Sequence, residues 1–216
     1  MATQPQKKHA MSRLQKRSLI VFVVLFALGL SFIDHNLGKK IRPKVEAQTS
    51  SNSDVRKYHL KTFKVVNVVD GDTLDIDIPD GEYENTRIRL IGVDTPETKN
   101  PGVEQMYYGL QSSDYVRQIA LDKKVRVIID SISSARDRYG RLLAYIQFED
   151  ENTLNELIIK NGFGYADLRF AHSRFEKYVT IQSQAVKNKI GLWRDVQKHQ
   201  LPAWLNRENP DILKKK

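Results

Sequence analysis

The stretch that most constrains the fold is residues 87–97, Arg-Ile-Arg-Leu-Ile-Gly-Val-Asp-Thr-Pro-Glu. Its first half alternates arginine with apolar residues, which is the period of a β-strand with one buried face. Pro96 lacks a backbone N–H, so it cannot continue a strand ladder, and it holds Thr95 in an extended conformation. The stretch therefore predicts a strand that ends in a turn, and this turn carries the carboxylates of Asp94 and Glu97.

Other segments of the chain have the composition of short strands, at residues 63–69, 74–78, 125–129 and 142–148. An Asp-Gly turn signal at Asp70-Gly71 separates the first two of them. Helical spacing of apolar residues is found at residues 111–121, 153–160 and 174–189. Five strands with a helix between the third and the fourth predict an α+β fold, a small Greek-key barrel of the OB type with three helices.

Residues 18–33 are apolar and uncharged, and a basic segment precedes them. A helix of this length covers roughly 24 Å, which local thinning of the bilayer or long basic side chains at its ends can accommodate. Because no small-residue cleavage site follows, we predict an uncleaved transmembrane signal-anchor; secretion after cleavage is the alternative. Five Lys and Arg residues precede the span and four follow it closely, which gives a slight bias toward a body outside the cytoplasm.

Charge and residue usage narrow the class of protein. The formal net charge of +9 suits a polyanionic partner or an anionic membrane surface. The chain has no cysteine, which excludes disulfides, thiol catalysis and zinc–thiolate sites. The histidines lack ligand spacing, which argues against a histidine–metal mechanism, and His172 is expected to be a solvated surface residue.

The chain is thus expected to consist of five segments. These are a basic N-terminal segment (1–17), the signal-anchor (18–33), a flexible linker (34–58), a folded domain (59–196) and a basic C-terminal tail (197–216).

Three separated motifs carry candidate chemistry: Asp70-Gly71-Asp72-Thr73, residues 89–97, and Asp137-Arg138-Tyr139-Gly140-Arg141. Together they offer acidic oxygens, which suit a hard cation such as calcium. Their arginines have guanidinium forks that match phosphate oxygens. Glu97 is free to position or deprotonate a water molecule. These are the groups that hydrolysis of a phosphodiester requires.

In this order the motifs resemble the thermonuclease, or staphylococcal nuclease-like, family over roughly residues 60–194. Shorter matches are Tyr108-Gly109, Asn155-Glu156-Leu157 and Gly191-Leu192-Trp193. The resemblance implies an OB-type barrel in a nuclease domain that cleaves DNA and RNA with one calcium ion. It implies that the carboxylates of Asp72 and Asp94 and the backbone carbonyl of Thr95 ligate the calcium, with Asp70 beside the metal's waters.

The same resemblance implies roles for the remaining motif residues. Glu97 activates the attacking water, while Arg89 and Arg141 hold the scissile phosphate and stabilise the charge that develops on it. Tyr139 contacts the terminal phosphate of the nucleotide, and Arg138 keeps a positive charge that the family has beside it. For the aromatic side chain that stacks on the base, Tyr165 is the first candidate and Phe170 the second.

The resulting interpretation is a monomeric, membrane-anchored, calcium-dependent nuclease. The alternative is a nucleic-acid-binding module that keeps the barrel and has lost catalysis. Such modules lose the metal-binding acids or the phosphate-binding arginines, whereas this chain has all of them: Asp72, Asp94, Glu97, Arg89 and Arg141.

Overall fold

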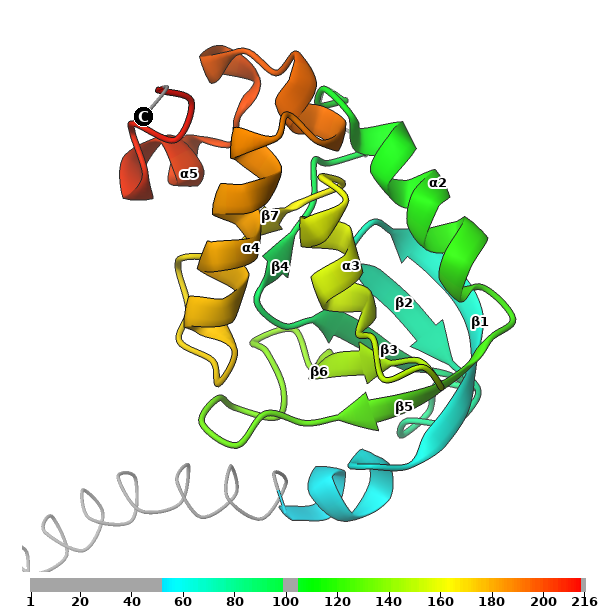
Figure 1. Ribbon diagram of the computed structural model, residues 1–216. Helices are drawn as coiled ribbons and strands as arrows, with labels where there is room; N and C mark the ends of the chain where they lie inside the picture. The colour runs from blue at the N-terminus through cyan, green and yellow to red at the C-terminus, as the bar shows by residue number, and fades with distance from the viewer. Residues whose placement is uncertain (1–51, 99–104, 215–216) are drawn as a thin grey trace, which may run out of the picture. The chain divides into compact units, whose positions relative to one another are not determined.

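The computed structural model of the chain describes residues 52–98 and 105–214 (Figure 1). The signal-anchor expected at residues 18–33 and the basic segment before it lie outside these ranges. Within the described ranges, no helix is both long enough and apolar enough to cross a membrane.

Five strands close into a barrel in the order β1-β2-β3-β6-β5. Their bounds are β1 Thr62–Asp70, β2 Thr73–Ile76, β3 Thr86–Leu90, β5 Lys124–Ile128 and β6 Leu142–Gln147. β3 and β6 pair in parallel, and the other neighbours in the barrel are antiparallel. The predicted five-stranded barrel is confirmed.

Alternation along β3 explains how the sequence fills the barrel. Ile88 and Leu90 are buried inside, whereas Arg87 and Arg89 point away from the interior. The other strands add residues at the same period, and together they form the barrel core: Val65, Leu74, Ile76, Ile88, Leu90, Val125, Val127, Leu142, Ala144 and Ile146. Their burial removes a large apolar area from water and is the main force that closes the barrel.

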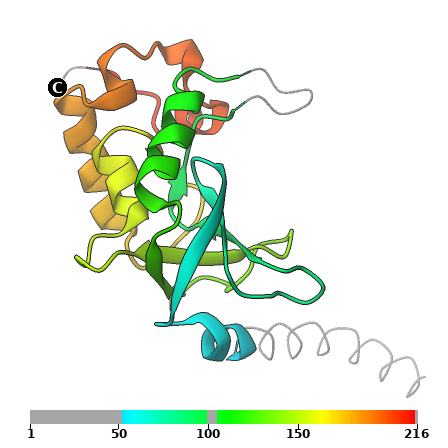
Figure 2. The same cartoon turned by 90° about the vertical axis from the view of Figure 1, so that its right-hand side faces the viewer.

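Helices gather on one side of this barrel (Figures 1 and 2). They are α2 Gly109–Ala120, α3 Leu154–Lys160 and α4 Phe175–Lys187, close to the predicted bounds. α2 packs against β1, and α3 packs against both β6 and α4.

A small two-stranded sheet continues the chain beyond β3. It pairs β4 Val93–Asp94 with β7 Tyr165–Ala166. The fully buried Asn155 of α3 fixes the turn before β4, because its Nδ2 donates to the carbonyls of Ile91 (3.0 Å) and Ala144 (3.3 Å). Its Oδ1 accepts the backbone N–H of Ile146 at 3.0 Å. The end of β3 is therefore tied to β6.

The segment expected to be a C-terminal tail is folded instead. After the 3₁₀ turn η1 Gly191–Arg194 come η2 Lys198–Gln200 and α5 Ala203–Glu208. They complete a second group of buried side chains, here named the C-terminal cluster: Tyr165, Ala185, Leu192, Trp193, Val196, Leu201, Trp204 and Leu205. The predicted boundary at residue 196 is wrong because Leu201, Trp204 and Leu205 bury against the domain.

The predicted linker also ends too late, because residues 52–58 are helical. Tyr58 is fully buried, and its hydroxyl shares a hydrogen bond of 3.0 Å with the Thr86 hydroxyl. Both carboxylate oxygens of Asp54 accept from Arg136, at 2.8 and 2.9 Å. A polar, short helix such as this one is stabilised by tertiary contacts, not by its own sequence.

Candidate active site

The turn between β1 and β2 brings the first motif against the second. Asp72 Oδ2 accepts the backbone N–H of Thr95 at 3.0 Å and its hydroxyl at 3.2 Å. A Cβ atom on Gly71 would lie 2.7 Å from Thr95 Oγ1, closer than such atoms approach, so this contact requires glycine. Asp72 and Thr95, separated in the sequence, are thus fixed side by side and are both buried.

Arg89 connects the two acids that were predicted to hold a metal. Its Nη2 lies 3.1 Å from Asp72 Oδ2 and 2.8 Å from Asp94 Oδ1. Its Nη1 donates to the backbone carbonyls of Leu90 at 3.0 Å and Val93 at 2.6 Å. The side chain is only 13% exposed. The guanidinium group is therefore held in one orientation at the end of β3.

The acids of this site lie close enough to perturb one another. Burial and the neighbouring charge of Asp72 raise the pKa of Asp70 to about 7. Burial raises the pKa of Asp94, and the charge of Asp72 raises it further. The charge of Arg89 lowers the pKa of both Asp70 and Asp94 and so offsets part of this repulsion, which a bound cation would also relieve.

Glu97 lies at the exposed rim of the site. Partial loss of solvent around the carboxyl group raises the pKa of Glu97, and the negative charges of Asp72 and Asp94 raise it further. The positive charges of Arg89 and Arg141 lower it. Its backbone carbonyl accepts the N–H of Met106 at 3.0 Å, just before α2. The carboxyl group is therefore subject to charges of both signs, from the acids and from the arginines.

The loop before β6 carries Arg141 and is organised around Asp137. Asp137 accepts the backbone N–H groups of Tyr139 (2.9 Å) and Arg141 (3.0 Å) and the Arg141 Nε (2.7 Å). Gly140 has a φ of +82°, a conformation that favours glycine. Arg141 is thus held by its own loop and remains 30% exposed.

Tyr139 is the exposed aromatic residue of this loop, at 68% exposure. The Arg138 guanidinium lies 4.7 Å from its ring centre and donates to its hydroxyl at 2.6 Å. Both side chains are accessible to a substrate, as their predicted roles require.

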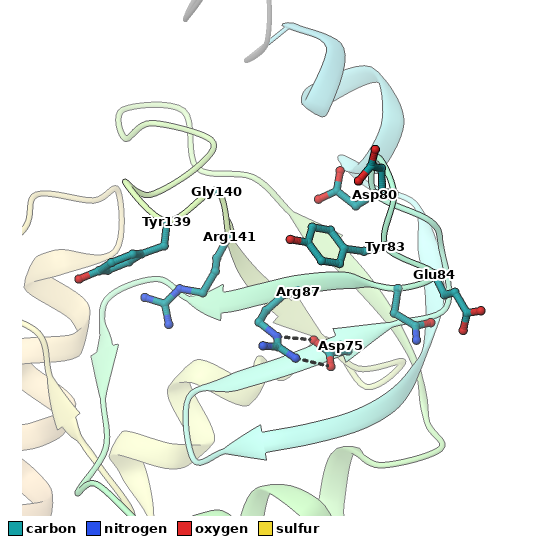
Figure 3. Close-up of a pocket in the computed structure, with 10 residues that line it drawn as sticks. Asp75, Asp80, Tyr83, Glu84, Arg87, Tyr139, Gly140 and Arg141 are labelled. Carbon is teal, nitrogen blue, oxygen red and sulfur yellow. Dashed lines mark hydrogen bonds and ion pairs between the residues drawn. The ribbon is translucent and has the colours of Figure 1, made fainter. Parts of the chain in front are cut away.

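A pocket of about 610 Å³ adjoins Arg141 (Figure 3). Tyr139 and Arg141 line one side of it, and Tyr83 lines the other. Arg87 enters the same space with its guanidinium held by Asp75, at 2.8 and 3.1 Å. Asp72, Asp94 and Glu97 are not among its lining residues, so the pocket lies beside the acidic site.

Tyr165 does not fit the predicted base-stacking role. It is 1% exposed, and its ring packs edge-on against Trp193 and Trp204 in the C-terminal cluster. A buried ring of this kind has no free face for a base. Phe170, the second candidate, is 65% exposed and remains accessible.

His172 is not the surface residue that was expected. It is 3% exposed, its Nδ1 lies 3.0 Å from the Tyr145 hydroxyl, and burial lowers its pKa. Its ring packs against Gly92, where any Cβ atom would lie 2.4 Å from it. The histidine therefore supports the turn that precedes Asp94.

Two residues near Asp94 were missed by sequence reasoning. Arg169 Nη2 lies 3.0 Å from Asp94 Oδ1, and the Trp204 indole N–H donates to Asp94 Oδ2 at 2.8 Å. Arg169 follows Asp167 in an irregular segment, and Trp204 lies in a short helix near the chain end. Neither position has a sequence signal that relates it to an acid far away in the chain.

The proposed metal ligands are two carboxylates and a carbonyl. In the part of the chain that is described, no three or more His, Cys, Asp or Glu side chains are arranged to hold a metal ion. Asp72 and Asp94 both form ion pairs with Arg89, and Thr95, which follows Asp94 in the chain, donates its backbone N–H to Asp72. A cation at this point would need the Thr95 carbonyl or water molecules to complete its shell of oxygen ligands.

The chain is similar in sequence to known proteins of one family. Residues 87–195 match the family described as "Staphylococcal nuclease homologue". The chain is 30% identical over 184 residues to a thermonuclease of Staphylococcus hyicus, covering 85% of this chain and 99% of that protein. It is 35% identical over 144 residues to a thermonuclease of Staphylococcus intermedius, covering 66% and 80% respectively.

A shorter match is the endonuclease YhcR of Bacillus subtilis, 32% identical over 136 residues, which are 59% of this chain and 11% of that protein. All three of these relatives are named as nucleases. The chain belongs to the staphylococcal nuclease family and is a nuclease, a hydrolase that acts on phosphodiester bonds of nucleic acids.

Proposed function

We propose that this nuclease depends on calcium and cleaves both DNA and RNA, with Asp72, Asp94 and the Thr95 carbonyl as metal ligands. The observation that carries the proposal is the position of Arg89, whose Nη2 lies within ion-pair distance of both Asp72 and Asp94. A phosphate-binding cation and two metal-binding acids thus converge on one point at the end of β3.

The donor set fits calcium. Carboxylate and carbonyl oxygens are hard ligands, which calcium prefers and accepts in flexible geometries. The raised pKa values of Asp70, Asp94 and Glu97 reflect burial together with repulsion from Asp72. A divalent cation would relieve this repulsion. When bound, it would supply positive charge beside the scissile phosphate.

The chain's own residues would then divide the work of hydrolysis. Glu97, accessible at the rim, takes a proton from the attacking water. Arg89 and Arg141 bind the phosphate oxygens and stabilise the negative charge that grows on them in the transition state. The exposed Tyr139 contacts the terminal phosphate of the nucleotide, Arg138 keeps a positive charge beside it, and Asp70 hydrogen-bonds to water beside the acids.

Substitution of Glu97 by glutamine tests this assignment. Glu97→Gln keeps the volume and removes the base, so kcat should fall by about 10²-fold or more, while nucleotide affinity stays within a few-fold. The assay should use the full chain with single-stranded DNA, calcium and then a chelator, because a fragment beginning at residue 59 would lack the buried Tyr58.

Three outcomes would count against the proposal in different ways. Full activity in chelator would exclude calcium dependence. A near-normal rate for Glu97→Gln would reject the proposed base. Calcium-dependent binding of DNA by the unmutated chain without any cleavage would favour the non-catalytic module.

We also propose that the protein is a monomer anchored by residues 18–33, with the nuclease domain outside the cytoplasm. The support is the uncharged apolar run and the basic residues before it. Full-length protein in the membrane fraction, digested by protease added outside intact cells, is the expected result. A shortened, soluble protein would favour secretion instead.

A further inference from the structure

We propose that Trp204 is a positioning residue for the carboxylate of Asp94, so that the C-terminal segment beyond the matched family region sets the affinity for calcium. This inference rests on the proposed function, because it concerns Asp94 as a calcium ligand. The matched region ends at residue 195, and Trp204 lies after it, in α5.

The contact itself is a direct hydrogen bond across the fold. The Trp204 Nε1–H donates to Asp94 Oδ2 at 2.8 Å, although the two residues are 110 positions apart in the chain. Hydrogen bonds to a charged acceptor are shorter and stronger than neutral ones. Because the indole nitrogen only donates, this bond restricts the orientation of the carboxylate without adding charge.

The Trp204 ring is itself held from several directions. The Arg169 guanidinium carbon lies 4.4 Å from the ring centre, and Tyr165 packs against it edge-on at 6.3 Å. Only 7% of the residue is exposed. Arg169 is fixed in turn by two hydrogen bonds of 2.8 Å to Asp167. An indole restrained in this way can hold its acceptor in one geometry.

The donors divide unequally between the two oxygens of Asp94. Oδ1 receives Arg89 at 2.8 Å and Arg169 at 3.0 Å, whereas Trp204 is the one donor to Oδ2 among the residues that the structure describes. Each carboxylate oxygen has about two acceptor positions, so Oδ2 retains one. The geometry thus leaves this oxygen available to a cation, with its orientation set by Trp204.

The second tryptophan of the chain provides a contrast within the same cluster. Trp193 is 4% exposed and also packs edge-on against Tyr165, at 5.7 Å. Its Nε1 is buried without a hydrogen-bond partner among the described residues. Replacing either tryptophan by phenylalanine removes one indole N–H from similar surroundings, but only at Trp204 does this change break a bond to the site.

Calcium titration of the full chain by calorimetry tests the inference, with Trp204→Phe compared against Trp193→Phe. Loss of a group that orients a metal ligand typically lowers metal affinity about 10–100-fold. We expect a loss of this size for Trp204→Phe and little change for Trp193→Phe. The kcat of Trp204→Phe at saturating calcium should fall much less than its calcium affinity.

A second measurement does not depend on the folding of Trp204→Phe. The chain has two tryptophans, so Trp193→Phe contains Trp204 alone. This variant identifies the Trp204 indole N–H resonance in an NMR spectrum of the unmutated protein. Adding calcium should shift that resonance and leave the Trp193 resonance in place.

The outcomes separate the inference from the proposed function. Equal losses of calcium affinity in Trp204→Phe and Trp193→Phe would mean that Trp204 contributes only packing, which would overturn the inference. A Trp204 resonance that does not shift when the protein binds calcium would overturn it too. If the unmutated chain binds calcium and cleaves DNA but Trp204→Phe matches it, only the inference fails. If the unmutated chain binds no calcium, the calcium proposal fails and the inference fails with it.

Discussion

The barrel core and the C-terminal cluster bury apolar side chains in different ways. The barrel core takes aliphatic residues from strands at alternate positions, such as Ile88 and Leu90 of β3. The C-terminal cluster takes aromatic residues from separate short elements, including Tyr165 of β7 and Trp204 of α5. The side chains of the barrel core contain no polar atoms, whereas each aromatic side chain of the C-terminal cluster has a polar atom, the tyrosine hydroxyl or the tryptophan indole N–H.

That difference determines what each region can do for the site. Strands of the barrel fix the backbone from which the acids and arginines project. Rings with polar atoms can both pack and donate, so the cluster reaches the acid through the Trp204 N–H. The comparison indicates that the barrel core carries stability and the C-terminal cluster adjusts the acidic site.

The largest expected effect comes from removing matched aliphatic side chains, one from each region. Ile88 and Leu205 are both fully buried. Ile88→Ala should cost about 2–5 kcal/mol in the free energy of unfolding, the usual range for such a cavity. Leu205→Ala should cost less, because α5 near the chain end can detach locally while the barrel stays folded.

Denaturant unfolding gives both free energies, and native-state hydrogen exchange shows where the structure opens. Amides of α5 should exchange faster in Leu205→Ala, with those of β3 unchanged. If Leu205→Ala lowers the protection of both elements equally, the two regions unfold as one unit and the comparison does not hold.

A smaller effect is expected for Tyr165→Phe. The Tyr165 hydroxyl is buried without a hydrogen-bond partner in the described ranges. Removing an unsatisfied buried polar group should leave stability unchanged or raise it by about 1 kcal/mol. Thermal unfolding measures this change. A clear loss of stability would show that the hydroxyl has a bonding role.

The nucleotide affinity of Tyr165→Phe tests the finding that Tyr165 is not the residue that stacks on the base. A ring that is 1% exposed should not contribute to binding, so the affinity of Tyr165→Phe should match that of the unmutated protein. A matched control is Tyr139→Phe, which removes a hydroxyl from a ring that is 68% exposed and should weaken binding.

Much of the barrel could be predicted because its signals are local. The alternation in residues 87–93 reports one buried face, and Asp70-Gly71 marks a tight turn. The acids and arginines of the site lie on these strands and turns, so their proximity follows once the strands are ordered. The sequence motifs also contain Asp72 and Thr95, which the structure brings together where Gly71 packs against Thr95.

The remaining features depend on contacts that no local pattern encodes. The helix at residues 52–58 is held by the Asp54–Arg136 ion pairs, and His172 is buried because Gly92 leaves space for its ring. Trp204 lies in a short apolar run, Leu201-Pro202-Ala203-Trp204-Leu205, which does not show by itself which surface it packs against. Such residues are recognised only when the distant surface that they pack against is known.

The parallel pairing of β3 with β6 has a consequence for how the protein folds. Ile88 pairs with Leu142, 54 residues later in the chain, and the two arginines proposed to bind phosphate lie next to this pair. The chain loses conformational entropy when it closes such a long loop, and this loss comes before the pairing stabilises it. Barrels of this kind therefore fold slowly, on the order of milliseconds to seconds. Until that step is complete, Arg89 and Arg141 are not held together, so we expect a newly made chain to have no partial nuclease activity before the barrel closes.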